Sequence, residues 1–122
     1  MLDAGTLIAI LGPHAKKLLE DRVKEYLKKP CGSKVKEGAF EDCTIELDED
    51  TDMAYIAVNP SRGEVIYLTS NTIRSVQFEK EDLKWSKGKL KTYYYYYITF
   101  KDGRRSRVRM RRKYRDAMLS HM

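Results

Sequence analysis

Apolar and polar residues alternate with a period of two over much of the chain after Gly38, which is typical of β-strands with one buried face. Turn-forming residues divide this region into six predicted strands, over residues 43–47, 54–58, 65–69, 73–79, 92–100 and 104–110. Residues 80–89 are predicted to be a polar connection. A helix is expected from about residue 111, because the apolar positions of this segment share one helical face: Tyr114, Ala117, Met118 and His121.

Individual side chains of the predicted strands can be assigned to a face. Cys43, Ile45 and Leu47 are expected to point inward, and they alternate with Asp42, Thr44 and Glu46 on a solvent-exposed face. Phe78, like Val76, is expected to point inward from the strand over residues 73–79.

The spacing before residue 34 is helical instead. Asp3 can cap a short helix over residues 4–11, and Pro13 suits the first turn of a second helix. Apolar residues recur at helical spacing from Ala15 to Leu27, and Pro30 ends the pattern. The sequence therefore predicts an N-terminal helical segment (residues 1–33) and a β-rich part (residues 34–122), which at 122 residues form one compact domain.

Strand pairing around Asp102 can be predicted from side-chain character. A two-residue turn would place Ile98 opposite Arg107, which mixes apolar and charged residues on one face. A three-residue loop over residues 101–103 avoids this, and Gly103 suits its left-handed last position. The predicted pairs are Phe100–Arg104, Ile98–Ser106, Tyr96–Val108 and Tyr94–Met110.

The opposite face of the same hairpin then carries tyrosine and arginine. It comprises Tyr93, Tyr95 and Tyr97 on one strand and Arg105, Arg107, Arg109 and Arg111 on the other. Cross-strand Tyr–Arg stacking would stabilise the sheet. The same ladder of rings and guanidinium groups is suited to binding phosphates or stacked bases. Both interpretations remain open at this point.

Charge is distributed unevenly around a formal net charge of +6. Residues 84–115 hold thirteen lysines and arginines and one acid, Asp102, whereas residues 41–52 hold seven acids and no base. A field of this kind attracts nucleic acid, anionic lipid or an acidic protein. If the acidic stretch lies across the arginine strand, it neutralises that strand; if it lies elsewhere, the basic face is open to a ligand.

Cys31 and Cys43 do not form a disulfide framework, and His14 and His121 lie far apart in the sequence, so no metal or other cofactor is expected. The chain shows no secretory signal and no apolar run long enough to span a bilayer, which favours a cytoplasmic protein with free thiols. No nucleophile is accompanied by a base, so an enzyme is not expected.

A family resemblance adds to this picture. Residues 64–78, in which a strand runs through Leu68 into a bend at Ile73, resemble the middle of bacterial pleckstrin-homology-like (PH-like) domains. The sequence around Asp102, the basic strand after it and the final helix are similar too. The resemblance implies an α+β, mostly β fold, a bent antiparallel sheet or partly open barrel of six to seven strands. It also implies a C-terminal helix and a role as a binding module; the N-terminal helices are additional to the family pattern.

The loop over residues 48–52 differs from lipid-binding members of the family, because it is acidic where they are basic, so their lipid site is not expected here. The leading hypothesis is a non-enzymatic module that recognises an acidic protein segment or an anionic surface through the Tyr/Arg face. The alternative is a small nucleic-acid-binding β-barrel that uses the same face. A homodimer is possible through exposed strand edges or the N-terminal segment.

Overall fold

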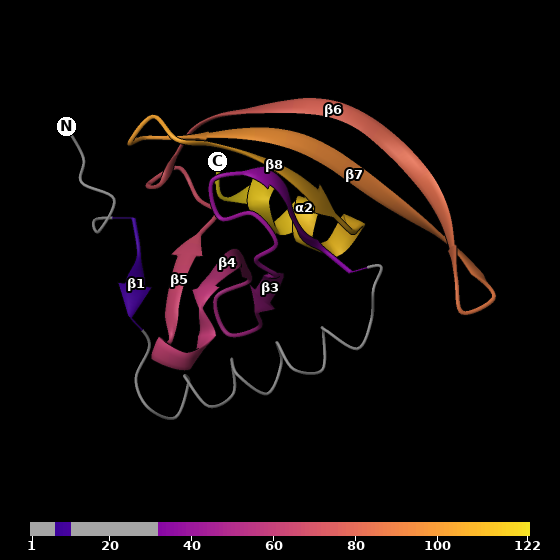
Figure 1. Ribbon diagram of the computed structural model, residues 1–122, viewed down its shortest axis with the longest axis horizontal. Helices are drawn as coiled ribbons and strands as arrows, with labels where there is room; N and C mark the ends of the chain where they lie inside the picture. Colours follow the sequence, from indigo (N-terminus) through magenta and orange to yellow (C-terminus); the bar gives the residue numbers. More distant parts are fainter. Residues whose placement is uncertain (1–6, 11–31) are drawn as a thin grey trace.

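Two four-stranded antiparallel sheets make up most of the protein in the computed structural model, which describes residues 7–10 and 32–122 (Figure 1). Sheet A has the strand order β1 (Ala9–Ile10), β5 (Glu64–Tyr67), β4 (Met53–Asn59), β3 (Ile45–Asp48). Sheet B has the order β2 (Lys34–Gly38), β8 (Arg105–Met110), β7 (Lys89–Phe100), β6 (Ile73–Ser86). A short 3₁₀ helix, η2 (Pro60–Arg62), precedes β5, and α2 (Arg112–Ser120) follows β8.

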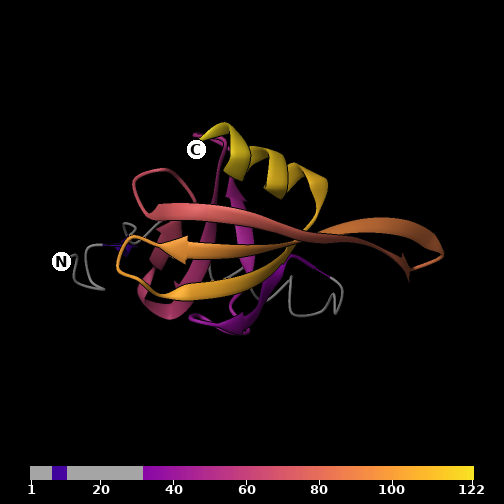
Figure 2. The same cartoon turned by 90° about the horizontal axis from the view of Figure 1, so that it is seen from above.

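The main hydrophobic core lies between the two sheets. Sheet B arches over sheet A, and α2 contacts β3 and β4 of one sheet and β7 and β8 of the other (Figures 1 and 2). Fully buried side chains come from both sheets and from α2, among them Ile45, Ile56, Ile66, Leu68, Ile98, Phe100, Val108, Met110 and Met118. The α+β, mostly antiparallel class with a C-terminal helix is therefore confirmed.

The predicted hairpin register is also confirmed. The β7–β8 pairs are Tyr94↔Met110, Tyr95↔Arg109, Tyr96↔Val108, Tyr97↔Arg107, Ile98↔Ser106 and Thr99↔Arg105. The amide of Phe100 donates to the carbonyl of Arg104 at 2.8 Å, which closes the three-residue loop. Gly103 adopts a positive φ of 93°, as the loop type requires.

The number of strands and their closure differ from the prediction. Eight strands occur within the described residues instead of six to seven, because β1 (residues 9–10) and β2 (residues 34–38) add to the six predicted strands. The two sheets are linked by an isolated bridge between Lys34 and Thr44, and the described strands do not close into a barrel.

The N-terminal helical segment is contradicted where it can be examined. Ala9 and Ile10 lie in β1, paired with Val65 and Glu64, where a helix over residues 4–11 was predicted. Leu7, just before β1, is 4% exposed in the main core, whereas Ile10 at the end of β1 is 76% exposed. The helix predicted from Ala15 to Pro30 lies outside the described residues. No helix in the described part has the length and apolar character needed to cross a bilayer.

Residues 80–89 are strand and turn, and the predicted polar connection is wrong. β6 continues to Ser86 and β7 begins at Lys89, so the two strands form a two-stranded arm that projects beyond the core (Figures 1 and 2). Lys87 and Gly88 at its tip both have positive φ angles, 53° and 74°, which is typical of a tight hairpin turn. The polar composition of this segment reflects exposure of the arm.

Two predictions of side-chain exposure are also corrected. Thr44 and Glu46 are buried, at 4% and 8% exposed, although their face was expected to meet solvent. Glu46 pairs with Tyr55, whose face of sheet A carries a second apolar cluster of Tyr55, Ala57 and Val65. Sheet A is thus buried on both faces. Phe78 is 54% exposed and makes an edge contact with the ring of Tyr96, at the base of the arm.

Candidate anion-binding face

The outer face of sheet B brings the predicted tyrosines and arginines together. Each guanidinium carbon lies about 5 Å from the centre of a tyrosine ring: Arg105 over Tyr97 at 4.7 Å, Arg107 over Tyr95 at 5.0 Å, Arg109 over Tyr93 at 5.0 Å and Arg111 over Tyr93 at 5.5 Å. The directly paired residues are Tyr97 with Arg107 and Tyr95 with Arg109, so the stacks of Arg105, Arg107 and Arg109 are diagonal, displaced by two residues along the strand. By the same register, Arg111 lies opposite Tyr93, the ring on which it stacks. We call this arrangement the Tyr/Arg ladder.

Burial differs along the ladder. Tyr93 is fully buried, Tyr95 is 4% exposed and Arg109 is 3% exposed. Arg105 is exposed, and Arg111 is half-buried. The Nε and Nη2 groups of Arg109 both donate to the carbonyl of Gly32, at 3.1 and 2.5 Å, which holds this side chain against the chain that precedes β2. The inner rings of the ladder are therefore covered and do not offer a flat surface on which a base could stack.

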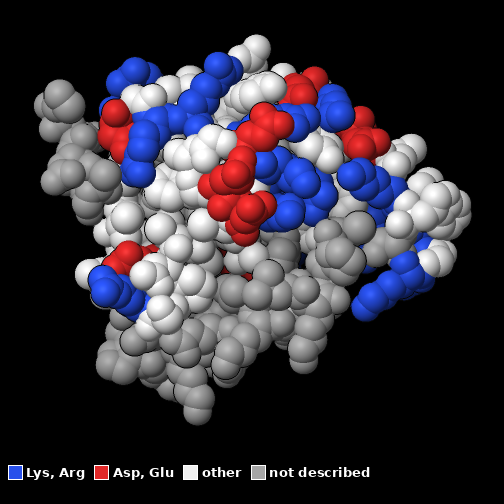
Figure 3. Space-filling view, in the orientation of Figure 1, with Lys and Arg blue, Asp and Glu red and all other residues white. Residues whose placement is uncertain are grey.

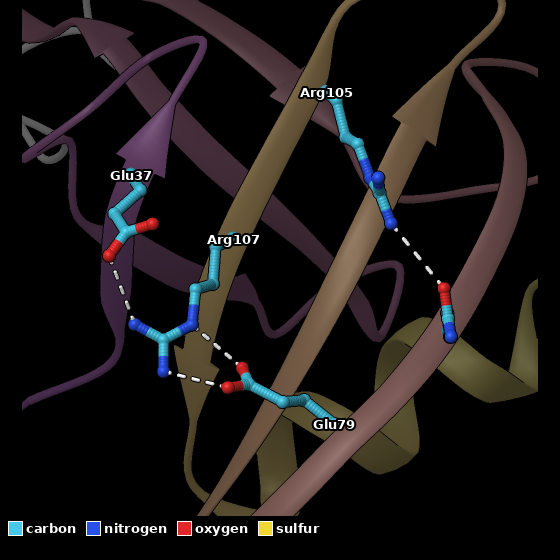
Figure 4. Close-up of polar contacts among 5 residues, drawn as sticks. Glu37, Glu79, Arg105 and Arg107 are labelled. Atoms are coloured by element: carbon cyan, nitrogen blue, oxygen red, sulfur yellow. Dashed lines mark hydrogen bonds and ion pairs between the residues drawn. The ribbon is translucent and has the colours of Figure 1, made fainter.

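Arg107 is neutralised by carboxylates from both neighbouring sides of the sheet. It makes a two-pronged ion pair with Glu79 of β6, Nε–Oε2 at 2.7 Å and Nη2–Oε1 at 2.9 Å, and a further bond from Nη1 to Glu37 of β2 at 3.2 Å (Figure 4). The hydrogen bond from Arg107 is the main cause that lowers the pKa of Glu79, and the same bond raises the pKa of Arg107. Arg105 donates only a long bond, 3.4 Å, to the side-chain oxygen of Gln77.

The acidic stretch over residues 41–52 does not supply these carboxylates. It runs through β3 in sheet A, and the ion pair that links it to sheet B joins Asp42 to Lys34 at 3.8 Å. At the ladder, neutralisation by described residues is limited to Glu37 and Glu79, and both act on Arg107.

A second group of cations gathers beside the buried end of the ladder. Lys34 pairs with Arg109 across β2 and β8, and Lys36 lies in the β-bulge that follows Val35. Burial is the main cause that lowers the pKa of Lys36, and the charges of Arg109, Lys34 and Lys84 lower it further. We call this group the basic corner (Lys34, Lys36, Lys84 and Arg109); within it, Lys34 also makes the 3.8 Å ion pair with Asp42.

Sequence reasoning missed most of the basic corner. Lys34 and Lys36 precede the region that was assigned to strands, and Lys84 fell in the predicted connection. The available signal was the alternation Lys34–Val35–Lys36, because a buried valine between two lysines indicates a short edge strand with a basic outer face. Lys80 was missed for the same reason as Lys84, and its ammonium lies 4.9 Å from the ring centre of Tyr95.

Cys43 and His121 are the cysteine and the histidine among the described residues, and they have separate surroundings. Burial, helped by the charge of Asp42, raises the pKa of the Cys43 thiol, which keeps it protonated and weakly nucleophilic at neutral pH. The described residues contain no cluster of three or more histidines, cysteines or acids that could hold a metal ion. The side chain of His121 meets a backbone carbonyl, that of Asp52, at 3.1 Å.

Comparison with protein-family models, curated proteins and solved structures finds no match to this chain.

Proposed function

We propose that this protein is a non-enzymatic binding module of the PH-like kind that recognises an acidic protein segment through the outer face of sheet B. The observation that carries the proposal is the basic corner, where Lys34 lies opposite Arg109 across β2 and β8 and the positive charges of Lys34, Lys84 and Arg109 act on Lys36. Binding an anion there would relieve this repulsion, which is a source of binding free energy that a neutralised surface lacks. A cytoplasmic location is part of the proposal, and the free thiol of Cys43 agrees with it.

The roles of the corner residues follow from their exposure. Lys34 and Lys36 are half-buried, so their ammonium groups can contact a ligand while their aliphatic stems pack on the sheet. Lys84, on the arm, contributes its charge to the corner. Arg109 is buried and bonded to Gly32, so it contributes charge without direct contact. Arg105 and Arg111, at the two ends of the ladder, extend the surface over which a ligand can bind.

An acidic peptide suits this face better than a nucleic acid. The carboxylates of Glu37 on β2 and Glu79 on β6 lie on either side of the ladder. They would repel some of the phosphates of a regularly spaced nucleic-acid backbone. A flexible peptide can place its acids on the lysines and avoid the carboxylates. Single-stranded nucleic acid would also need exposed rings, and those of Tyr93 and Tyr95 are buried.

The test is binding of a labelled peptide of alternating glutamate and serine, followed by fluorescence anisotropy at two salt concentrations. The wild type should bind, and binding should weaken as salt increases. The double variant Lys34→Glu/Lys36→Glu should bind about tenfold or more weakly, because two attractive charges become repulsive. The matched control is Lys101→Glu/Lys113→Glu, which makes the same charge change at exposed positions elsewhere and should bind within about twofold of wild type.

Two results would overturn this proposal. One is equal loss of binding in both double variants, which would indicate that only net charge matters. The other is tighter binding, at the same salt, to single-stranded DNA or to phosphatidylserine vesicles than to the peptide, which would assign the face to nucleic acid or lipid. Far-UV circular dichroism on each variant checks that the fold is retained.

A further inference from the structure

β6 forms an open edge of sheet B. It is a strand of 14 residues, paired with β7 on one side, and no other described strand lies on its second side. Its last third, with the facing part of β7, forms the arm that projects from the core in both views (Figures 1 and 2). A long unpaired edge exposes a row of backbone donors and acceptors that can pair with another strand.

The arm also exposes large apolar side chains. Leu83, Trp85 and Leu90 are 58%, 73% and 53% exposed. Leu83 pairs with Thr92 and Trp85 with Leu90, so these residues lie on one face of the arm, and Glu81 precedes them on that face. Charged residues occupy the other face, with Asp82 opposite Tyr93 and Lys84 opposite Lys91.

The charges along β6 are self-complementary. Glu81 and Asp82 come before Leu83, and Lys84 comes after it. When a strand pairs antiparallel with its own copy, a residue before the two-fold axis lies opposite a residue after it. An axis at Leu83 therefore places Asp82 of each copy opposite Lys84 of the other, on the same face of the joined sheet.

The neighbouring registers are unfavourable. An axis at Asp82 or at Lys84 places identical charges directly opposite each other, and an axis at Glu81 does the same with glutamates. Sliding one strand by a single residue against the other, so that Leu83 lies opposite Lys84, would place the apolar face of one arm beside the charged face of the other. Among the registers centred on residues 81–84, the charge order therefore favours the one with Leu83 at its centre.

We propose that two copies of this chain pair antiparallel along β6, with the two-fold axis at Leu83. Leu83 then meets Leu83 of the second copy, and Trp85 lies diagonal to that leucine, within reach of an aromatic side chain. Two Asp82–Lys84 ion pairs flank the axis. The two sheets B join into one continuous eight-stranded sheet, and Leu83 and Trp85 of each copy lie side by side with those of the other on one face of it.

A second copy explains the arm better than a lipid surface does. The arm carries lysines at its tip, but Glu79, Glu81 and Asp82 lie on the same strand. In Figure 3, basic, acidic and uncharged side chains lie next to one another over the region of β6 and β7. An anionic bilayer would repel those acids, whereas the second copy pairs Asp82 with a lysine.

Charge exchange tests the pairing. In Asp82→Lys, lysine would lie opposite Lys84 of the other copy; in Lys84→Asp, aspartate would lie opposite Asp82. By analytical ultracentrifugation over a concentration series, the wild type should dimerise and each variant alone should do so about tenfold or more weakly. An equimolar mixture of the two variants should restore dimerisation, because both flanking pairs are then opposite in charge.

Lys91→Asp is the matched control for Lys84→Asp. Lys91 lies on the same face of the arm, but on β7, away from the open edge. Its substitution should change the dimerisation constant by about twofold or less. The proposal is overturned by a wild type that stays monomeric at all concentrations, by a mixture that does not restore dimers, or by equal weakening in Lys91→Asp. Equal loss of binding to phosphatidylserine vesicles in Lys84→Asp and Lys91→Asp, without dimers, would assign the arm to lipid.

Discussion

Arg107 shows how a single side chain both stabilises the sheet and limits what the ladder can bind. Its guanidinium stacks on Tyr95 and is bonded to Glu79 and Glu37, so β2, β8, β7 and β6 are all joined through one group. A ligand that used Arg107 would have to displace Glu79. This is why the lysines of the basic corner, and not the centre of the ladder, carry the proposed function.

The Arg107–Glu79 pair leads to a pH prediction. Because the pKa of Glu79 in the folded state lies below its ordinary value of 4.5, the pair stabilises the fold above that pH and loses its effect as pH falls further. Glu79→Gln should therefore lower the melting temperature at pH 7, and the difference from wild type should shrink below pH of about 4. Thermal unfolding followed by circular dichroism at both pH values checks this.

Glu37→Gln is the control for that experiment. The Glu37 side chain is 65% exposed and makes one bond to Arg107, against two bonds for Glu79, so its loss should change the melting temperature less at neutral pH. If the melting temperatures of Glu79→Gln and wild type differ by the same amount from pH 7 to pH 3, the stabilising effect of the pair does not depend on ionisation of Glu79.

For individual residues, the sequence was sufficient to assign side chains to faces of the sheet but not to predict how exposed they are. The parity of residues 93–97 and 105–111 follows from the pleat, which is local. Burial of Tyr93 and Arg109 depends on what covers the outer face, such as the Gly32 carbonyl, and this contact joins residues 77 apart. Arg109→Glu should therefore destabilise the fold, since a buried carboxylate would face a carbonyl oxygen.

Among the elements, the β2–β8 contact depends on one glycine. Gly38 has φ of +87°, and a Cβ atom built there would lie 2.3 Å from the backbone oxygen of Arg105. Gly103, in the β7–β8 loop, has a similar φ of +93° but no neighbour within 4 Å of the same atom. The two positions share a backbone conformation and differ in the space available.

Alanine substitutions at Gly38 and Gly103 separate the steric effect of a close neighbour from the cost of a left-handed backbone. Gly103→Ala should cost about 1 kcal/mol, the usual cost of a left-handed alanine. Gly38→Ala should cost about 1–3 kcal/mol more, because β2 must also move away from β8. Urea unfolding of both variants gives the difference directly. Equal losses would show that β2 can shift freely at this point.

Elements were predictable where turns and side-chain alternation agreed. The β7–β8 hairpin fulfilled both conditions, since Gly103 fixed the loop and the alternation fixed the register. The arm had the alternation of Leu83 and Trp85, but the many charges between them indicated a loop. β1 could not be recognised because its partner, β5, lies more than fifty residues away, and an apolar run that short is compatible with helix or strand.

For the molecule as a whole, α2 holds the two sheets together. Ala117 and Met118 are buried in the main core, and the helix contacts two strands of each sheet. The acidic stretch and the basic strand lie in different sheets, so the uneven charge of the sequence becomes a separation of charge in space. The periodicity of the last twelve residues predicted this helix, but not that it would contact both sheets.

Two adjacent residues of α2 test this role. Met118→Ala should destabilise the protein by about 2–5 kcal/mol, because it removes a fully buried side chain from the place where both sheets meet. Leu119→Ala should change stability by about 0.5 kcal/mol or less, since Leu119 is 45% exposed. Chemical denaturation should give a single transition in both cases. Separate transitions in Met118→Ala would show that one sheet can stay folded without the other.

The position of Trp85 has a practical consequence for experiments in solution. It is the only tryptophan in the sequence, and it lies exposed on the arm, whereas Tyr93, Tyr94 and Tyr95 are buried. Selective excitation of its indole therefore monitors the surroundings of the arm, and emission from the tyrosines monitors the interior. A blue shift of the indole spectrum on concentrating the protein, with unchanged tyrosine emission, would follow contacts of the arm without any added label.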